Sequence, residues 1–346
     1  MDTSSQASAS YGSAPGPTDP PQPSYDQLTP AQVATGGAAI VANVERVIAG
    51  QSSVIELGVT IFLAHGHILI EDVPGVGKTM MAKALAASIG AQVKRIQFTP
   101  DLLPSDVTGA PIFNQATRRF EFEAGPIFAN LVIADEINRA SPRTQSALLE
   151  CMEEGQVTVE GTTYALPQPF HVIATQNPID MEGTHALLEA QRDRFMARIS
   201  LGYPDEAAER DMVRARDLGE PIRAIGPVVS LTDVLRMIQT ARSIYVAEPV
   251  RDYAVALTRA TRRSPAVVLG ASPRAAVHLV TAAKARAALQ SRAFVLPDDV
   301  QALAVPVLAH RIMATNPARG PEGMAQAAAI IRDCIAMVPV PVPIQR

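Results

Sequence analysis

The chain has 346 residues, of which 47% are hydrophobic and 18% charged, and its formal net charge at pH 7 is −4. This length predicts two domains with a sizeable apolar core, and the net negative charge excludes a chain-wide attraction to nucleic acid or anionic membranes. Cys151 and Cys334 lie in apolar helical patterns without metal-ligand spacing, and no secretory signal or bilayer-spanning apolar run is evident, so we expect a cytoplasmic protein without membrane insertion.

Composition divides the chain into four segments. Residues 1–34 are rich in Ser, Pro, Gly and Ala, which predicts a disordered tail because such a segment buries little apolar surface. Residues 35–203 alternate strand and helix patterns, whereas residues 204–338 carry helical patterns. Residues 339–346 are interrupted by prolines and are expected to form a loose tail.

The 35–203 segment predicts a parallel α/β sheet. Its strand and helix patterns, in chain order, are "HILIED" (67–72), "KTMMAKALAASIG" (78–90), "QVKRIQF" (92–98), "NLVIADE" (130–136), "SPRTQSALLECMEEG" (141–155) and "FHVIATQN" (170–177). Nearly continuous apolar runs suit strands that are covered on both faces. Two hairpins are expected as insertions, at 110–123 and at 156–166 with its turn at Glu160-Gly161. Ligands of such sheets bind beyond the carboxyl ends of the strands.

The stretch "EDVPGVGKTM" lies between a predicted strand and a predicted helix, which is the context of a phosphate-binding loop. Lys78 would reach the β- and γ-phosphates of a nucleotide, and Thr79 would bind Mg²⁺. Asp72 stands where the loop pattern has its first glycine, so a turn that merely contains Gly-Lys-Thr remains an alternative. The residues expected to contact the nucleotide here are Pro74, Gly75, Val76, Gly77, Lys78, Thr79 and Met80.

Polar residues end two of the buried strands. Asp135 and Glu136 follow "LVIA", and Asn177 follows "VIATQ". Asp135 would help to hold Mg²⁺, Glu136 would polarise the attacking water, and Asn177 would hydrogen-bond that water or the γ-phosphate. The alternatives are a solvated acidic pair and a polar turn residue.

Arginines mark two further places. The segment "EAQRDRFMARI" contains Arg192, Arg194 and Arg198, of which the last two share a face if the helix persists, and one of the cluster is a candidate arginine finger. In "GASPRAAV", Ser272 is expected to cap a helix whose first turn holds Arg274. A cation there opposes the helix dipole, which indicates a phosphate partner. The alternative for each arginine is an incidental surface position.

The set "EDVPGVGKT", "LVIADEINRASPRTQSALLECMEEGQVTVEG", "ATQNPIDMEGTHALLEAQRDRF" and "GASPRAA" resembles the MoxR-type AAA+ ATPases over about residues 45–315. The resemblance implies an αβα P-loop core with a smaller all-helical lid. It implies Lys78 and Thr79 as Walker A residues and Asp135 with Glu136 as Walker B. It also implies Asn177 as sensor 1.

The same resemblance assigns further positions. Arg274 matches sensor 2, and Arg194 matches the arginine finger. Arg192 stands where the family more often has an apolar residue, which leaves the choice between it and Arg194 open. Gly50 and Gln51 are implied beside the adenine, although a plain loop is an equal alternative.

The family resemblance implies a Mg²⁺-dependent ATPase in a hexameric ring, with both hairpins facing its centre. Such proteins remodel protein clients together with a von Willebrand A domain partner, in the maturation of enzymes or in cofactor or metal insertion.

Three other function classes are weaker. A ring-type nucleic-acid motor or loader would need basic pore residues, but the predicted hairpin tip places Glu121 and Glu123 beside Arg118 and Arg119. A GTP switch would need an Asn-Lys-x-Asp motif, which is absent, and a non-catalytic scaffold would not need the complete lysine and acid set. His65 and His67 form an H-x-H pair without a visible third ligand, which favours a structural role.

Overall fold

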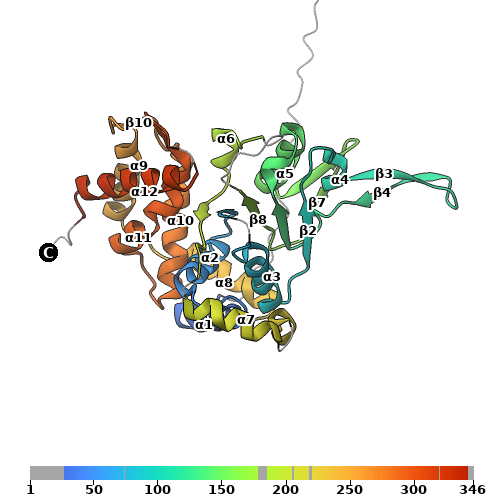
Figure 1. The fold of residues 1–346 in the computed structure, drawn as a ribbon, viewed down its shortest axis with the longest axis horizontal. Helices are drawn as coiled ribbons and strands as arrows, with labels where there is room; N and C mark the ends of the chain where they lie inside the picture. Colours follow the sequence, from blue (N-terminus) through green and yellow to red (C-terminus); the bar gives the residue numbers. More distant parts are fainter. Residues whose placement is uncertain are drawn as a thin grey trace, which may run out of the picture.

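The computed structural model describes residues 27–73, 75–177, 185–204, 206–217, 220–318 and 320–341. It confirms an α/β core beside a smaller, mainly helical lid, with a long hairpin projecting from the core on the side away from the lid (Figure 1). The first helix, α1 (Pro30–Glu45), begins inside the expected tail because Thr29 and Gln32 form a capping box and Pro30 occupies its first turn. The boundary expected at residue 34 is therefore too late.

A five-stranded sheet forms the centre of the core, with the order β2-β5-β8-β1-β9. The strands are β1 (Ile68–Glu71), β2 (Val93–Gln97), β5 (Leu131–Asp135), β8 (His171–Gln176) and β9 (Ala197–Ile199). Every pairing in this sheet is parallel, as expected from the buried apolar runs. All carboxyl ends therefore lie at one edge of the sheet, and all amino ends lie at the opposite edge.

Alternate residues of the central strands face two apolar cores. Leu131 and Ile133 face the core shared with α1, α2 (Ser52–Leu63), α3 (Lys78–Ser88) and the lid. Val132 and Ala134 face the core shared with α5 (Pro142–Glu154). Cys151 and Cys334 are buried free thiols, as predicted. The sheet is thus covered on both faces, which explains its nearly continuous apolar strands.

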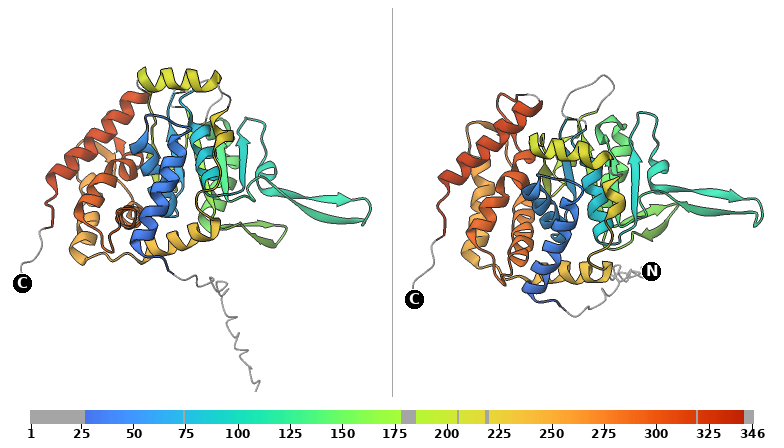
Figure 2. Two further views of the ribbon diagram at one scale, coloured as in Figure 1. Left: turned by 90° about the horizontal axis from the view of Figure 1, so that it is seen from below. Right: turned by 60° about the horizontal axis from the view of Figure 1, so that its bottom comes forward.

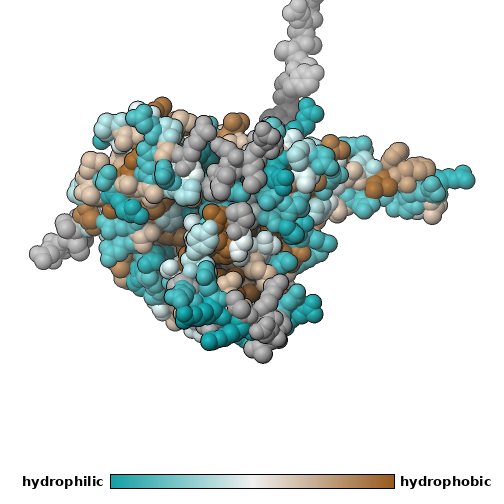
Figure 3. All heavy atoms as spheres, viewed as in Figure 1, coloured by the Kyte–Doolittle hydropathy of each residue, from teal (hydrophilic) through white to brown (hydrophobic). Residues whose placement is uncertain are grey.

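Both predicted hairpins are confirmed. One consists of β3 (Gly109–Asn114) and β4 (Arg119–Ala124), follows the short α4 (Pro104–Thr108), and extends far from the body in each view (Figure 2). The other consists of β6 (Gln156–Val159) and β7 (Thr162–Ala165), with both turn residues in the left-handed region. Apolar side chains gather on the longer hairpin (Figure 3), where Phe113 and Phe120 are 50% and 71% exposed.

The lid is mostly helical. Its helices are α7 (Glu206–Asp217), α8 (Leu231–Ser243), α9 (Glu248–Thr261), α10 (Pro273–Leu289), α11 (Pro297–Leu308) and α12 (Gly320–Met337). The 3-10 helices η2 (Pro221–Ala224) and η3 (Ala309–Arg311) and a two-stranded ribbon, β10 (Val267–Leu269) with β11 (Met313–Ala314), complete it. Helix α10 packs against α1 and α2, so the apolar core runs from the α/β domain into the lid. No described helix is long and apolar enough to cross a membrane.

The arginine-rich segment differs from its prediction. Helix α6 (Glu189–Arg192) ends at Arg192, and the short strand β9 begins five residues later. The helix therefore does not persist as far as Arg198, and Arg194 and Arg198 do not share a helix face. Strand β9 forms because it pairs with β1, which is distant in the sequence. The spacing of neighbouring residues, on which the helix prediction depended, contains no information on this pairing.

Candidate nucleotide-binding site

The loop between β1 and α3 has the backbone of a phosphate cradle. Gly75 and Gly77 have φ values of +87° and +92°, a conformation that glycine adopts far more readily than other residues. Val76 lies between them, and Met80 lies in the first turn of α3, whose N-terminal N–H groups favour an anion. Pro74 lies outside the described residues.

Lys78 reaches across the carboxyl ends of two strands. Its Nζ donates to the carbonyl oxygen of Asp72 at 2.7 Å and to that of Gln176 at 3.4 Å. Burial lowers the pKa of Lys78, although the negative charges of Asp72 and Asp135 oppose this effect. The ammonium group is thus held in a half-buried position at the edge where a phosphate would approach the loop.

Asp72 accounts for the unusual first position of the loop. Its φ is not positive, so no glycine is required there. Its buried carboxylate accepts hydrogen bonds from Ser200 Oγ at 3.0 Å and from the backbone N–H of Gly202 at 2.7 Å. The side chain therefore ties the loop entrance to the segment that follows β9.

We expect Asp72→Ala to lower the free energy of unfolding by about 2 kcal/mol, because it leaves buried donors without their charged acceptor. Urea unfolding measures this change. Asp252→Ala, at an exposed position of α9, is the control and should alter stability by less than about 0.5 kcal/mol. Equal stability of the two variants would contradict the structural role of Asp72.

Thr79 and Asp135 meet at the carboxyl edge. Thr79 Oγ1 lies 3.3 Å from Asp135 Oδ2, and Asp135 Oδ1 accepts a hydrogen bond of 2.5 Å from Thr175 Oγ1. Burial raises the pKa of Asp135, but Thr175, Arg95 and Thr79 all donate to its carboxylate and have the opposite effect. The net result is a lowered pKa. A hydroxyl and an ionised carboxylate are oxygen ligands of the kind that Mg²⁺ prefers, so this pair fits the ion.

The sequence analysis missed Arg95. Its Nη2 lies 2.7 Å from Asp135 Oδ2, and Gln97 on the same strand donates to Glu136 at 3.2 Å. The register that pairs Gln97 with Asp135 brings both side chains to the site. The sequence shows that Arg95 and Gln97 are two residues apart and thus on one face of a strand. It does not show that β5 is the strand beside them. Arg95 donates to the same Asp135 oxygen that lies beside Thr79.

Glu136 lies next to Asp135 in a strained backbone conformation. Its φ and ψ are 57° and 50°, in the left-handed region, and the 3-10 helix η1 (Ile137–Arg139) follows it. Strain of this kind costs roughly 1–3 kcal/mol and concentrates at functional sites. The Glu136 carboxylate is held by Arg139 at 2.9 Å and by Gln97.

Asn177 follows β8, directly after the Gln176 carbonyl that Lys78 contacts. Its own carbonyl accepts a hydrogen bond of 3.4 Å from Asn138 Nδ2. The structure therefore brings Lys78, Thr79, Asp135, Glu136 and Asn177 to one edge of the sheet, as the sequence predicted for a single site.

The loop before α2 adjoins this edge. Gly50 packs against Ala208 of α7, because a Cβ on Gly50 would lie 3.0 Å from the Ala208 Cβ. Ile48 Cδ1 would lie 3.4 Å from a Cβ on Gly77. Gln51 precedes α2 as its N-cap residue. These contacts bring the loop to the phosphate cradle, and the adenine contacts of Gly50 and Gln51 stay a prediction.

Arg194 and Arg274 lie at the opposite edge of the sheet. Both form ion pairs with Glu153 at the end of α5, at 3.1 Å for Arg194 Nε, and both line a pocket of about 260 Å³. His67, which directly precedes β1, lines the same pocket. Because strands β1 and β9 are parallel, this pocket is separated from the loop after β1 by four strand residues, or roughly 13 Å.

Arg192 has different surroundings from Arg194. It pairs with Glu189 at 3.6 Å and lines a second pocket together with Glu71 and Arg198. Arg198 in turn pairs with Glu71 at 3.1 Å. Only Arg194 of these three arginines shares a carboxylate with Arg274, and this favours Arg194 as the finger candidate.

Known proteins resemble this chain over most of its length. Residues 67–197 match the model described as "ATPase family associated with various cellular activities (AAA)", and residues 259–334 match the AAA lid domain. The chain is 49% identical over 302 residues to the uncharacterized protein YeaC of Bacillus subtilis (strain 168), covering 87% of this chain and 94% of YeaC. It is 41% identical over 288 residues to the chaperone MoxR1 of Mycobacterium tuberculosis (strain ATCC 25618 / H37Rv), covering 81% of this chain and 76% of MoxR1.

The chain belongs to the MoxR-type AAA+ ATPases. The crystal structure of "a putative ATPase from Cytophaga hutchinsonii ATCC 33406" superimposes with a TM-score of 0.80 and 37% identity, and the match covers 90% of this chain and 97% of that one. The protein is accordingly a nucleotide-binding, ATP-hydrolysing enzyme with a chaperone-like role. The fold and the family predicted from the sequence are confirmed.

In the H-x-H pair of this MoxR-type ATPase, hydrogen bonds to the backbone indicate a structural role for His67. His67 Nε2 donates to the Met152 carbonyl at 3.0 Å, and its Nδ1 accepts from the N–H of Val172 at 3.0 Å. Both ring nitrogens are therefore engaged by backbone. Among the described residues, no group of three or more His, Cys, Asp or Glu side chains is arranged to hold a metal ion.

Proposed function

We propose that this ATPase hydrolyses ATP between neighbouring subunits of a hexameric ring. The observation that carries the proposal is the separation of its two sets of residues. Lys78, Thr79 and Asp135 meet at the carboxyl edge of the sheet, while Arg194 and Arg274 converge on Glu153 at the amino edge. A ring in which one subunit's amino edge faces the next subunit's carboxyl edge brings the two sets together.

Each residue at the carboxyl edge has a proposed role. The backbone from Pro74 to Gly77 and the start of α3 at Met80 would cradle the phosphates, with Lys78 on the β- and γ-phosphates. Thr79 and Asp135 would hold Mg²⁺, which neutralises charge on the phosphate oxygens when bound. Gly50 and Gln51 would lie by the adenine.

The chemical step requires a base and a means of stabilising charge. Glu136 would take a proton from the water that attacks the γ-phosphorus, while the bond from this phosphorus to the bridging oxygen breaks and yields ADP and phosphate. Asn177 would orient that water. Arg194 and Arg274 of the adjacent subunit would stabilise the charge that develops on the leaving oxygen and on the transferred group.

The energy of hydrolysis would serve the remodelling of protein clients. The similarity to the chaperone MoxR1 supports this role, and we propose a von Willebrand A domain partner and a function in enzyme maturation or metal insertion. The long hairpin supports a protein client rather than nucleic acid, because it exposes Phe113 and Phe120. In addition, Glu121 lies on the same strand, β4, as Arg119.

Mixing two inactive variants tests the shared site. Arg194→Ala removes the finger and Lys78→Ala removes the phosphate contact, so each alone should lose ATP hydrolysis by about 10³-fold or more. In mixed rings, an Arg194→Ala subunit keeps a competent nucleotide site and receives the intact arginines of a Lys78→Ala neighbour. We expect phosphate release to recover with mixing, and a failure to recover at every mixing ratio would argue against the shared site.

A further inference from the structure

A buried network joins the lid to the segment that carries Arg194. Arg311, in η3 of the lid, has a side chain that is 1% exposed. Its Nε donates to Asp193 Oδ1 at 2.8 Å, and its Nη2 donates to the carbonyl oxygens of Asp193 at 3.0 Å and Phe195 at 2.6 Å. The residues on both sides of Arg194 are therefore bound to one guanidinium group.

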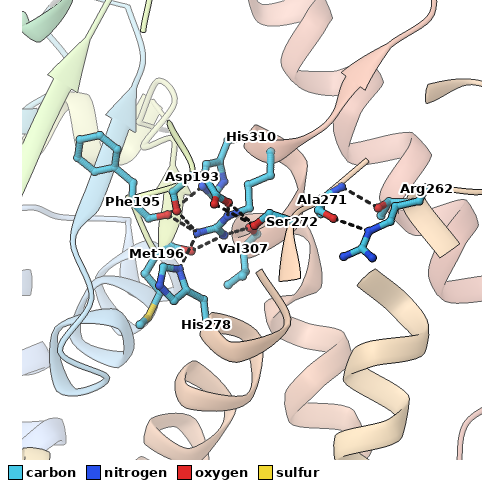
Figure 4. A network of polar contacts seen from close by, with 11 residues as sticks. Asp193, Phe195, Met196, Arg262, Ala271, Ser272, His278, Val307 and His310 are labelled. Atoms are coloured by element: carbon cyan, nitrogen blue, oxygen red, sulfur yellow. Dashed lines mark hydrogen bonds and ion pairs between the residues drawn. The ribbon is translucent and has the colours of Figure 1, made fainter. Parts of the chain in front are cut away.

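Asp193 makes a second connection to the lid. Ser272 Oγ lies 2.9 Å from each oxygen of the Asp193 carboxylate (Figure 4). Ser272 occupies the N-cap position of α10, but its side chain makes no capping hydrogen bond, so the expected cap is wrong in this respect. The hydroxyl is used across the domain boundary instead. Asp193, which directly precedes Arg194, is thus bound to Ser272, which lies two residues before Arg274.

Histidines complete the network on the lid side. Arg311 Nη2 donates to His278 Nδ1 at 2.6 Å, and His310 Nε2 donates to the Phe195 carbonyl at 3.1 Å. Burial lowers the pKa of Arg311 to about 10 while Asp193 opposes the decrease, so the guanidinium remains charged at neutral pH. Asp193, Ser272, His278, His310 and Arg311 are together called the Arg311 network below.

We propose that the Arg311 network is a positioning element that fixes the spacing between Arg194 and Arg274, so that the core and the lid present both guanidinium groups to a neighbouring subunit as one unit. The inference rests on the proposed function, since it concerns the arginines of that shared site. Asp193 and Arg311 do not touch the nucleotide in this scheme. They act through the two arginines that follow Asp193 and Ser272 in the chain.

Arg311→Lys is the informative change, because lysine keeps the charge but cannot reproduce the planar set of donors to Asp193 and Phe195. We expect kcat for ATP to fall by about 100-fold, since a displacement of about 1 Å at a catalytic group has this effect. KM for ATP and the Kd of a fluorescent ATP analogue should stay within about twofold, because the phosphate loop lies at the other edge of the sheet.

Arg292→Lys is the matched control. Arg292 forms a two-pronged ion pair with the buried Asp299 at 2.6 and 2.8 Å within the lid. Within the described part of the chain, its side-chain hydrogen bonds go to Asp299, Phe294 and Gln290, and none reaches the Arg194 segment. It should lower thermal stability as Arg311→Lys does and leave kcat within about twofold of the unchanged protein. Asp193→Asn, which keeps the shape and removes the charge, should follow Arg311→Lys.

Mixing with Lys78→Ala separates positioning from general damage. A Lys78→Ala neighbour supplies an intact Arg311 network, so Arg311→Lys subunits should recover phosphate release as Arg194→Ala subunits do. Normal kcat in Arg311→Lys, or loss that mixing does not restore while Arg194→Ala is restored, would overturn the inference and leave the shared site standing. Failure of Arg194→Ala itself to recover would remove the basis of both proposals.

Discussion

Glu136→Gln is expected to retain ATP binding and to lose hydrolysis, with kcat lower by about 10²–10⁴-fold, because a general base contributes a factor of this size. Glutamine keeps the shape of the side chain but cannot accept the proton of the attacking water. Arg139 and Gln97 both contact Oε2 of Glu136, and we propose Oε1 as the oxygen that takes the proton.

Two measurements check this expectation. Phosphate release gives kcat, and equilibrium binding of an ATP analogue gives the Kd, which should change by less than about threefold because binding depends on Lys78 and the loop. Glu150→Gln, at an exposed position of α5, is the control and should hydrolyse ATP normally. Normal turnover in Glu136→Gln would remove Glu136 from the role of base.

The residues of the carboxyl edge were predictable because each lies next to a strong local signal. Asp135 ends one apolar strand, Asn177 directly follows another, and Lys78 follows a glycine-rich turn. In a parallel sheet these ends must meet at one edge, so local patterns and one topological rule are sufficient. The geometry agrees with that expectation, and Thr79 Oγ1 lies 3.3 Å from Asp135 Oδ2.

The amino edge was not predictable in the same way. The sequence pattern predicts Glu153 as an exposed acid near the end of an amphipathic helix. Nothing in the adjacent sequence indicates that two arginines bind it. Asp193 and Arg311 are 118 residues apart, so their ion pair depends on the docking of the lid. Local patterns contain no information on such contacts. For the same reason, Ser272 was assigned as a cap from its position although its hydroxyl binds Asp193.

The free energy of unfolding is expected to fall as the pH decreases from about 6.5 toward 4. Burial lowers the pKa of five histidines in the folded protein, namely His65, His67, His171, His278 and His310. Below pH 6.5 the unfolded chain binds protons that these folded side chains do not, so stability is complete above that pH and declines below it. Each fully buried histidine contributes a slope of about 1.4 kcal/mol per pH unit until its folded pKa is reached.

His67→Gln isolates one part of this slope. The pKa of His67 is lowered to about 4, so the variant should lose about 1.4 kcal/mol per unit of the pH dependence of stability between pH 6.5 and 4. Urea unfolding at several pH values measures the slope, and His185→Gln, at an exposed position, is the control. An unchanged slope in His67→Gln would show that this histidine does not set the acid sensitivity.

Four of these histidines lie close to Arg194 and Arg274 or to the segment that carries Arg194, so their protonation changes the charge in that region. His65, His67 and His278 line the pocket that contains Arg194 and Arg274, and His310 binds the Phe195 carbonyl. Nδ1 of His310 and Nε2 of His171 are buried without a hydrogen-bond partner among the described residues, so a proton added there has no acceptor. Protonation therefore adds positive charge beside the two arginines and weakens the contact between core and lid. ATP hydrolysis should consequently decline at a higher pH than ATP binding, because binding depends on the opposite edge of the sheet.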